Sequence, residues 1–220
     1  MTEPSGDSSK PRRPVAVPIV ALLAITALGI TALLGGLNER PDPAPPQLKL
    51  GQVLDQGQFD TVFVESKVTF QPAENEFAKD KRFVDVVFKV TNKTDRTVSV
   101  GGLPSVKDKS KGFSFGSTLL KVTPEIKSQY GPELFVLSKG VQSSQLQPGI
   151  QATVIARYEL EGAAQPPKQL SYDVGAFELL TNPLDDGSNW FLKSEQGALD
   201  DTSEEEVVAK ITLPVKAQEA

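Results

Sequence analysis

The clearest pattern along the chain is a change from one long apolar stretch to many short alternating ones. Residues 15–37 contain no charged side chain, and a helix of this length, at about 1.5 Å of rise per residue, crosses a hydrocarbon core of about 30 Å. After this stretch, apolar and polar residues alternate in short runs. The pattern therefore predicts one transmembrane helix at residues 15–37, followed by a strand-rich domain in water.

Charges beside the apolar stretch predict its orientation. Lys10, Arg12 and Arg13 precede it, whereas Arg40 follows among acidic neighbours, and basic residues stay on the cytoplasmic side. We therefore expect a single-pass protein of the cell membrane, with its N-terminus in the cytoplasm and its C-terminal domain outside. A cleavable signal peptide is the alternative, but its apolar core would be shorter and would end at a small-x-small site.

Composition divides the rest of the chain. Residues 1–14 are rich in Ser, Pro and charged residues, so we expect a disordered cytoplasmic tail. Residues 38–47 contain four prolines, which favour an extended, semi-rigid stalk. Residues 48–216 are numerous enough for one domain with its own core. Residues 217–220 are expected to be a short C-terminal tail.

Alternation with a period of two residues predicts strands that bury one face. In residues 82–92, Val84, Val86, Phe88 and Val90 fall on one side. The same rule predicts strands at residues 59–70, 150–160, 170–180 and 207–215. Within the first two of these it places Val62, Val64, Val68, Phe70, Ile150, Val154, Ala156 and Tyr158 inward, and Ile155 outward.

Turn-forming residues separate the predicted strands. They occur at residues 92–96, 147–149, 161–168 and 185–187. No long segment after residue 37 has helical spacing. Many short strands without alternating helices predict an all-β, antiparallel β-sandwich.

Two stretches resemble a known class of domain. In residues 83–100 a hydrophobic strand ends in Thr-Asn, turns through polar residues and resumes, and in residues 146–160 a Pro-Gly turn precedes a long alternating strand. Both resemble the bacterial, actinobacterial-type immunoglobulin-like domains of unknown function on Gram-positive cell surfaces, which are similar to secreted immunogenic proteins of mycobacteria. The resemblance covers roughly residues 48–180, and the segment after Thr181 looks like an elaboration. It implies an immunoglobulin-like sandwich, an extracytoplasmic location and protein contacts.

Charge and cysteine content narrow the class of function. The first 47 residues carry equal numbers of basic and acidic side chains, so the net charge of −5 belongs to the outer domain. We therefore expect no nucleic-acid partner, since there is no basic face to neutralise phosphates. The chain has no cysteine, so the exported domain must be stable without disulfides.

Catalytic motifs are weak in this chain. Residues 112–116 match the G-x-S-x-G pattern of serine hydrolases, with Ser114 as nucleophile, but the chain has no histidine to act as its base. Zinc lacks both histidine and cysteine ligands, and no pair of carboxylates is marked out for glycoside hydrolysis. We therefore expect no enzyme activity, no catalytic residue and no cofactor.

Two acidic loops raise the question of calcium. Oxygen ligands occur around Asp185 and Asp186 and again around Asp200 and Asp201. Neither loop has the spacing of a helix-loop-helix site, and we expect solvated acidic loops without a bound metal. Asn92 begins a glycosylation sequon, but asparagine also suits a tight turn at that position.

Aromatic residues in the expected loops are the candidate binding residues. Phe113 and Phe115 lie in a Gly/Ser/Lys-rich stretch, and Trp190 and Phe191 follow an acidic turn. Aromatic side chains on irregular segments are typical of binding patches. The alternative is that these loops fold back and the aromatic rings close the open end of the sandwich.

Small residues form a stripe on the expected transmembrane helix. Ala27, Thr31 and Gly35 recur every four residues, and such stripes allow close helix packing in membranes. Together with the aromatic loops, they favour a non-catalytic accessory subunit or assembly factor of a larger membrane protein complex. A stand-alone cell-envelope binder, surface sensor or adhesin is the alternative.

Overall fold

The described part of the protein is an all-β domain. A computed structural model describes residues 43–104, 112–128, 131–181, 187–195 and 204–217. Residues from Pro45 onward belong to one compact unit. No helix within the described ranges is long and apolar enough to span a membrane. The expected helix at residues 15–37, with Ala27, Thr31 and Gly35, lies outside the described residues.

Short strands and one 3-10 helix make up the domain. In chain order they are β1 (Val53–Asp55), β2 (Phe59–Gln71), β3 (Lys81–Asn92), β4 (Val98–Ser99), η1 (Phe115–Thr118), β5 (Leu119–Thr123), β6 (Glu133–Ser138), β7 (Val141–Ser143), β8 (Gln145–Leu146), β9 (Gln151–Leu160), β10 (Gln169–Val174), β11 (Phe177–Thr181), β12 (Ser188–Leu192) and β13 (Ala209–Lys216). The expected stretch 170–180 is thus two strands, because the chain leaves the sheet at Gly175 and Ala176.

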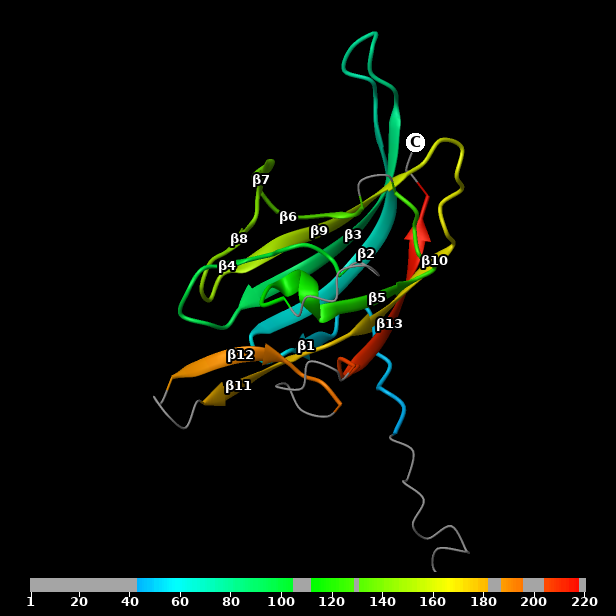
Figure 1. Ribbon diagram of the computed structural model, residues 1–220. Coiled ribbons are helices and arrows are strands. Elements are labelled where there is room, and N and C mark those ends of the chain that lie inside the picture. Colours follow the sequence, from blue (N-terminus) through cyan, green and yellow to red (C-terminus); the bar gives the residue numbers. More distant parts are fainter. Residues whose placement is uncertain (1–42, 105–111, 129–130, 182–186, 196–203, 218–220) are drawn as a thin grey trace, which may run out of the picture. The chain divides into compact units, whose positions relative to one another are not determined.

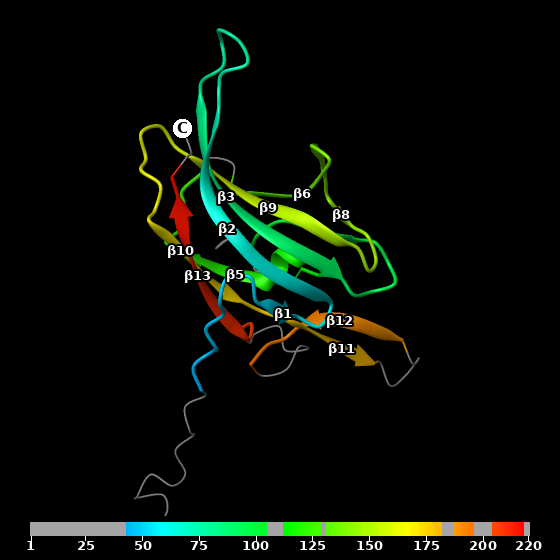
Figure 2. The ribbon, with the colours of Figure 1, turned by 180° about the vertical axis from the view of Figure 1, so that it is seen from behind.

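A nine-stranded sheet surrounds the core. Its order is β5-β10-β13-β2-β3-β9-β6-β7, and β1 pairs with β2. The sheet curls, so that β5, β10 and β13 lie over β2, β3, β9 and β6 (Figures 1 and 2). Two small ladders, β11-β12 and β4-β8, are separate from it. The predicted all-β architecture is confirmed, and the curl gives it a sandwich-like form.

The seam between the two layers departs from the predicted antiparallel pairing. At this seam β13 runs parallel to β2, with Val215 beside Ser66 and Lys216 beside Lys67. The hydroxyl of Ser66 also donates a hydrogen bond to the carbonyl oxygen of Pro214, at 2.9 Å. The last strand therefore closes the sheet against the long strand β2 in the same direction, which alternation alone does not reveal.

A bulge in β2 reverses the predicted orientation of its first half. The buried residues there are Phe59, Thr61 and Phe63, whereas Val64 is exposed. Pairing with β3 shifts between Phe63 and Glu65, which leaves Val64 as the extra residue. The prediction that Val62 and Val64 point into the core is wrong, because the bulge changes the phase of alternation along the strand.

The predicted inward face of β9 is largely confirmed. Val154, Ala156 and Tyr158 are buried. Ile150 precedes the strand and is 61% exposed, so its predicted burial is wrong. Ile155 was expected to face outward, yet it is only 8% exposed because Phe135 of β6 lies directly opposite it. The outer face of this layer is therefore partly covered by its own apolar side chains.

The C-terminal strand is integral to the core. β13 lies between β10 and β2, and its residues Ile211 and Leu213 are buried. The interpretation of everything after Thr181 as an elaboration is therefore wrong for this strand. Residue 47 forms a bridge with Lys210 at the start of β13, so the chain joins the domain there. We call this end of the domain the entry end.

Asn92 holds the turn after β3. Its buried amide group donates hydrogen bonds to the carbonyl oxygens of Arg96 and Leu146, at 2.7 and 3.0 Å. Its side-chain oxygen accepts hydrogen bonds from the backbone and hydroxyl of Thr94. The side chain of Asn92 therefore stabilises the turn, which accounts for an asparagine at this position without glycosylation.

Candidate functional site

The four candidate aromatic residues separate into one core residue and three near the surface. Phe115 is fully buried in η1, where its ring contacts those of Phe59 and Phe88 edge-on, at 5.8 and 5.7 Å between centroids. For this residue the alternative applies, in which a loop aromatic folds back and closes the core. Phe115 is therefore removed from the candidate binding residues.

Phe113 and Phe191 come together although they lie far apart in the sequence. Their ring centroids are 6.2 Å apart with an edge-on geometry, which is a favourable arrangement for aromatic pairs. Phe113 is 61% exposed, and Phe191 is half-buried on β12. The structure thus brings two of the predicted residues into one patch.

Trp190 belongs to the opposite face of the β11–β12 hairpin. It stands across from Leu179, which is 51% exposed. Its ring lies against Gly57, where a Cβ atom would collide with the carbonyl oxygen of Phe177. Gly57 also has a positive φ of 74°, a conformation that favours glycine. The close approach at Gly57 lets the hairpin pack on the sandwich while Leu179 stays exposed.

These residues form an apolar surface on a short hairpin. We call it the hairpin surface, and it has two faces: Phe113 and Phe191 lie on one, and Leu179 and Trp190 lie on the other. The hairpin is anchored at its base by two backbone hydrogen bonds. The amide of Lys193 donates to the carbonyl oxygen of Ala176, and the amide of Val208 donates to the carbonyl oxygen of Val174. Since Val174 pairs with Ala209 at the start of β13, the hairpin surface lies at the entry end (Figure 1).

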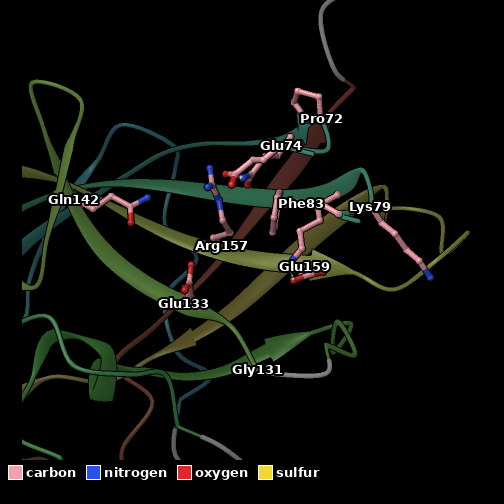
Figure 3. A pocket seen from close by; sticks show the side chains of 12 residues that line it. Pro72, Glu74, Lys79, Phe83, Gly131, Glu133, Gln142, Arg157 and Glu159 are labelled. Carbon is pink, nitrogen blue, oxygen red and sulfur yellow. Dashed lines mark hydrogen bonds and ion pairs between the residues drawn. The ribbon is translucent and has the colours of Figure 1, made fainter. Parts of the chain in front are cut away.

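A second region, which sequence reasoning missed, lies at the other end of the domain. It is a hollow of about 480 Å³ under the turn that joins β2 to β3, with walls from β3, β6, β7 and β9 (Figure 3). We call it the distal hollow. Its volume is in the range of small-molecule sites, about 300–1,000 Å³.

Arg157 forms the centre of the distal hollow. Its Nε and Nη2 groups donate to the two carboxylate oxygens of Asp85, at 2.8 and 2.7 Å. Phe83 and Phe135 hold the guanidinium by cation–π contacts, at 4.8 and 5.4 Å from the ring centroids. The hydrogen bonds that Arg157 donates to Asp85 raise the pKa of Arg157. Its position is thus set by groups that surround it.

The polar wall of the distal hollow is balanced in charge. Its lining includes three basic and three acidic side chains. Lys81 forms an ion pair with Glu159 at 3.1 Å, and Gln71 donates a long hydrogen bond to Glu74 at 3.4 Å. The lining thus contains basic and acidic side chains in equal number.

The turn above the distal hollow is ordered by its own side chains. The side-chain oxygen of Asn75 accepts hydrogen bonds from the amides of Phe77 and Ala78, and Asp80 accepts one from the amide of Ala73. Phe77 is 90% exposed at this turn. The available signal was that Asp85 and Arg157 occupy outward positions of two alternating strands, but only the pairing of β3 with β9 places them opposite each other.

The geometry around Ser114 differs from a nucleophile elbow. Ser114 precedes the 3-10 helix η1 with an extended backbone, and its hydroxyl oxygen lies 3.3 Å from that of Ser117. Within the described ranges no group of three or more His, Cys, Asp or Glu residues is placed to hold a metal. Asp185, Asp186, Asp200 and Asp201 lie outside those ranges.

No protein-family model matches the chain, and no curated protein matches it. The hairpin surface and the distal hollow are therefore the features on which a function can rest.

Proposed function

We propose that this chain is a single-pass membrane protein whose outer domain is a non-catalytic interaction module. It serves as an accessory subunit or assembly and stability factor of a larger membrane protein complex. The apolar stretch at residues 15–37 and the basic residues before it support an anchor with a cytoplasmic N-terminus. The domain then lies outside the cytoplasm, joined to the anchor by the proline-rich stalk.

We assign the domain to the immunoglobulin-like class. Numbered along the chain, the seven main strands are β2, β3, β5, β6, β9, β10 and β13. One layer then has the order first-second-fifth-fourth and the other third-sixth-seventh, which is the ABED and CFG arrangement of immunoglobulin constant-type domains. This order supports the resemblance to bacterial surface domains.

The position of the hairpin surface carries the functional proposal. Phe113, Trp190 and Phe191 gather at the entry end, where the chain that leads to the anchor joins the domain. At about 3.1 Å per residue, a stalk of ten residues spans only about 30 Å in the polyproline conformation. An apolar surface on this end is therefore within reach of the outer face of a membrane protein, and aromatic residues are typical anchors of such interfaces.

Co-purification of the full-length protein tests this function. The tagged protein is extracted in mild detergent, and membrane proteins that elute with it are quantified by mass spectrometry. Changing Phe113 and Phe191 together to Ala should reduce recovery of these membrane proteins at least about tenfold, because the proposed interface loses two aromatic anchors. Phe77→Ala removes an aromatic ring that is even more exposed, at the opposite end of the domain, and serves as the control.

Two results would count against the proposal. One is that the wild-type protein elutes without any membrane protein at stoichiometric amounts. The other is that Phe77→Ala lowers recovery while the double variant does not, which would move the contact to the opposite end of the domain.

Topology is tested separately from partner binding. Protease added to spheroplasts should remove the outer domain and leave an N-terminal tag protected. A mature protein that begins near residue 35 would overturn the anchor and would indicate a cleaved signal peptide instead.

A further inference from the structure

The distal hollow has the features of a ligand site that is separate from the hairpin surface. It lies under the β2–β3 turn, at the end of the domain opposite the entry end, and so faces away from the point where the stalk joins. Its central side chain, Arg157, is held in place by Asp85 and by two aromatic rings. Side chains that are fixed before binding lose little freedom when a ligand arrives.

Each central cation of the hollow already has an anionic partner. Arg157 is paired with Asp85, whose side chain is only 4% exposed, and Lys81 is paired with Glu159. Their charges are thus offset while part of their N–H groups remains available. The lining charges outside these two pairs are Lys79, Glu74 and Glu133, so a charged ligand of either sign meets a like charge in the same wall.

Several polar side chains of the hollow have unused hydrogen-bonding capacity. Within the described residues, the side chains of Lys79, Glu133 and Gln142 line the hollow and make no hydrogen bond. Arg157 uses only its Nε and one Nη2 contact for Asp85, which leaves N–H groups on its outer edge. The wall therefore offers donors and acceptors side by side around one compact volume.

We propose that the distal hollow binds a neutral, hydroxyl-rich ligand: a segment of glycan one or two sugar rings long. Hydroxyl groups both donate and accept, so they can bond to carboxylates and to guanidinium or amide N–H groups in the same wall. The volume of about 480 Å³ accommodates a ligand of this size. The site adds ligand binding to the domain and does not depend on a membrane partner.

Titration of the full-length protein in phosphatidylcholine nanodiscs tests the site. The probe is N,N′-diacetylchitobiose, followed by saturation-transfer NMR, and nanodiscs avoid the competing headgroups of sugar detergents. Saturable binding with a Kd of about 1 mM or tighter is expected. Glucosamine, which carries an ammonium group, and glucuronate, which carries a carboxylate, should each bind at least about tenfold more weakly than N-acetylglucosamine, since neither charge is favoured by the balanced wall.

Variants connect the binding to the hollow. Glu133→Gln and Gln142→Ala should each weaken binding of N,N′-diacetylchitobiose about tenfold, because the first replaces a charged acceptor oxygen with an N–H donor and the second removes the amide group altogether. Glu178→Gln makes the same chemical change at the entry end and should leave binding unchanged. Unaltered melting temperatures show that the variants remain folded.

Three outcomes would overturn the proposal. The neutral probe fails to saturate, Glu133→Gln and Gln142→Ala bind as the wild type does, or a charged sugar binds more tightly than N-acetylglucosamine. Loss of partner recovery in the co-purification experiment would leave this result untouched, so the two proposals fail independently.

Discussion

The phenolic oxygens of Tyr158 and Tyr172 lie 2.8 Å apart in the core and link β9 of one layer to β10 of the other. Both side chains are almost fully buried. Burial raises the pKa of Tyr158 to about 12 and holds that of Tyr172 well above its ordinary value. Each hydroxyl thus depends on the other for its hydrogen bond.

Removing one of the two hydroxyls should lower the free energy of unfolding by more than half of what removing both lowers it. Tyr158→Phe or Tyr172→Phe leaves the other hydroxyl buried without its partner, which should lower the free energy of unfolding by about 1–3 kcal/mol. The double Phe variant should recover part of this loss. Urea unfolding of the wild type, the two single variants and the double variant measures these free energies. A double variant whose loss equals the sum of the two single losses would contradict the mutual dependence of the hydroxyls.

The same pair predicts a loss of stability at alkaline pH. Unfolded tyrosine loses its proton near pH 10, whereas folded Tyr158 keeps its proton until about pH 12. The native state therefore binds more protons between these values, and the free energy of unfolding falls as pH rises through this window. The stabilisation is fully present below about pH 10. The double Phe variant should show a shallower decline in chemical unfolding measured across the window.

The Asp85–Arg157 pair should be worth more than an exposed ion pair. Asp85→Ala leaves the guanidinium half-buried without its carboxylate partner, and we expect a loss of about 1–3 kcal/mol in the free energy of unfolding. Lys67→Ala breaks the more exposed pair with Glu65 and should cost less than about 1 kcal/mol. Equal losses of stability for Asp85→Ala and Lys67→Ala in thermal unfolding would mean that burial of Arg157 adds nothing to the strength of its ion pair.

Charged substitutions along β9 should separate its buried and exposed positions. Val154→Asp places an unpaired charge between the layers and should cost several kcal/mol, of the order of a domain's whole stability. Ile155→Asp should also be costly, because Phe135 covers this side chain. Gln151→Asp, on the exposed start of the strand, should be nearly neutral. Yields of folded protein and urea midpoints report the order.

The stripe of small residues on the proposed transmembrane helix predicts that complex formation also depends on the anchor. Ala27→Leu together with Gly35→Leu should reduce recovery of the partner, because bulk on the stripe prevents close approach of a neighbouring helix. Gly29→Leu changes a small residue about 200° around the helix from Ala27 and is the control. Equal recovery from all three proteins would reduce the helix to a tether and leave recognition to the hairpin surface.

Alternation along the chain predicted strand identity better than strand phase. The run that ends in Val90 has one uninterrupted buried side, so its inward residues were correct. The phase of β2 could not be predicted, because one bulged residue at Val64 exchanges the two faces. Outward positions such as Ile155 are also decided by what the neighbouring strand presents, which local sequence does not contain.

The candidate site was predictable only in part. Aromatic residues in irregular segments identified Phe113 and Phe191, but burial assigned Phe115 to the core. The contact between Phe113 and Phe191 requires that the hairpin and the loop before η1 meet in space. The distal hollow was missed because its members come from five segments, each with ordinary polar residues.

The sequence by itself determined the class of the domain, the expectation of an anchor and the turns between strands, because hydrophobic period and turn chemistry act over a few residues. Tertiary structure alone decided the parallel seam of β2 with β13, the position of Arg157 between Asp85 and two aromatic rings, and the placing of the hairpin surface at the entry end. Each of these depends on contacts between segments that lie far apart in the chain. Pairing between distant strands decides which side chains become neighbours, and these neighbours form the hairpin surface and the distal hollow.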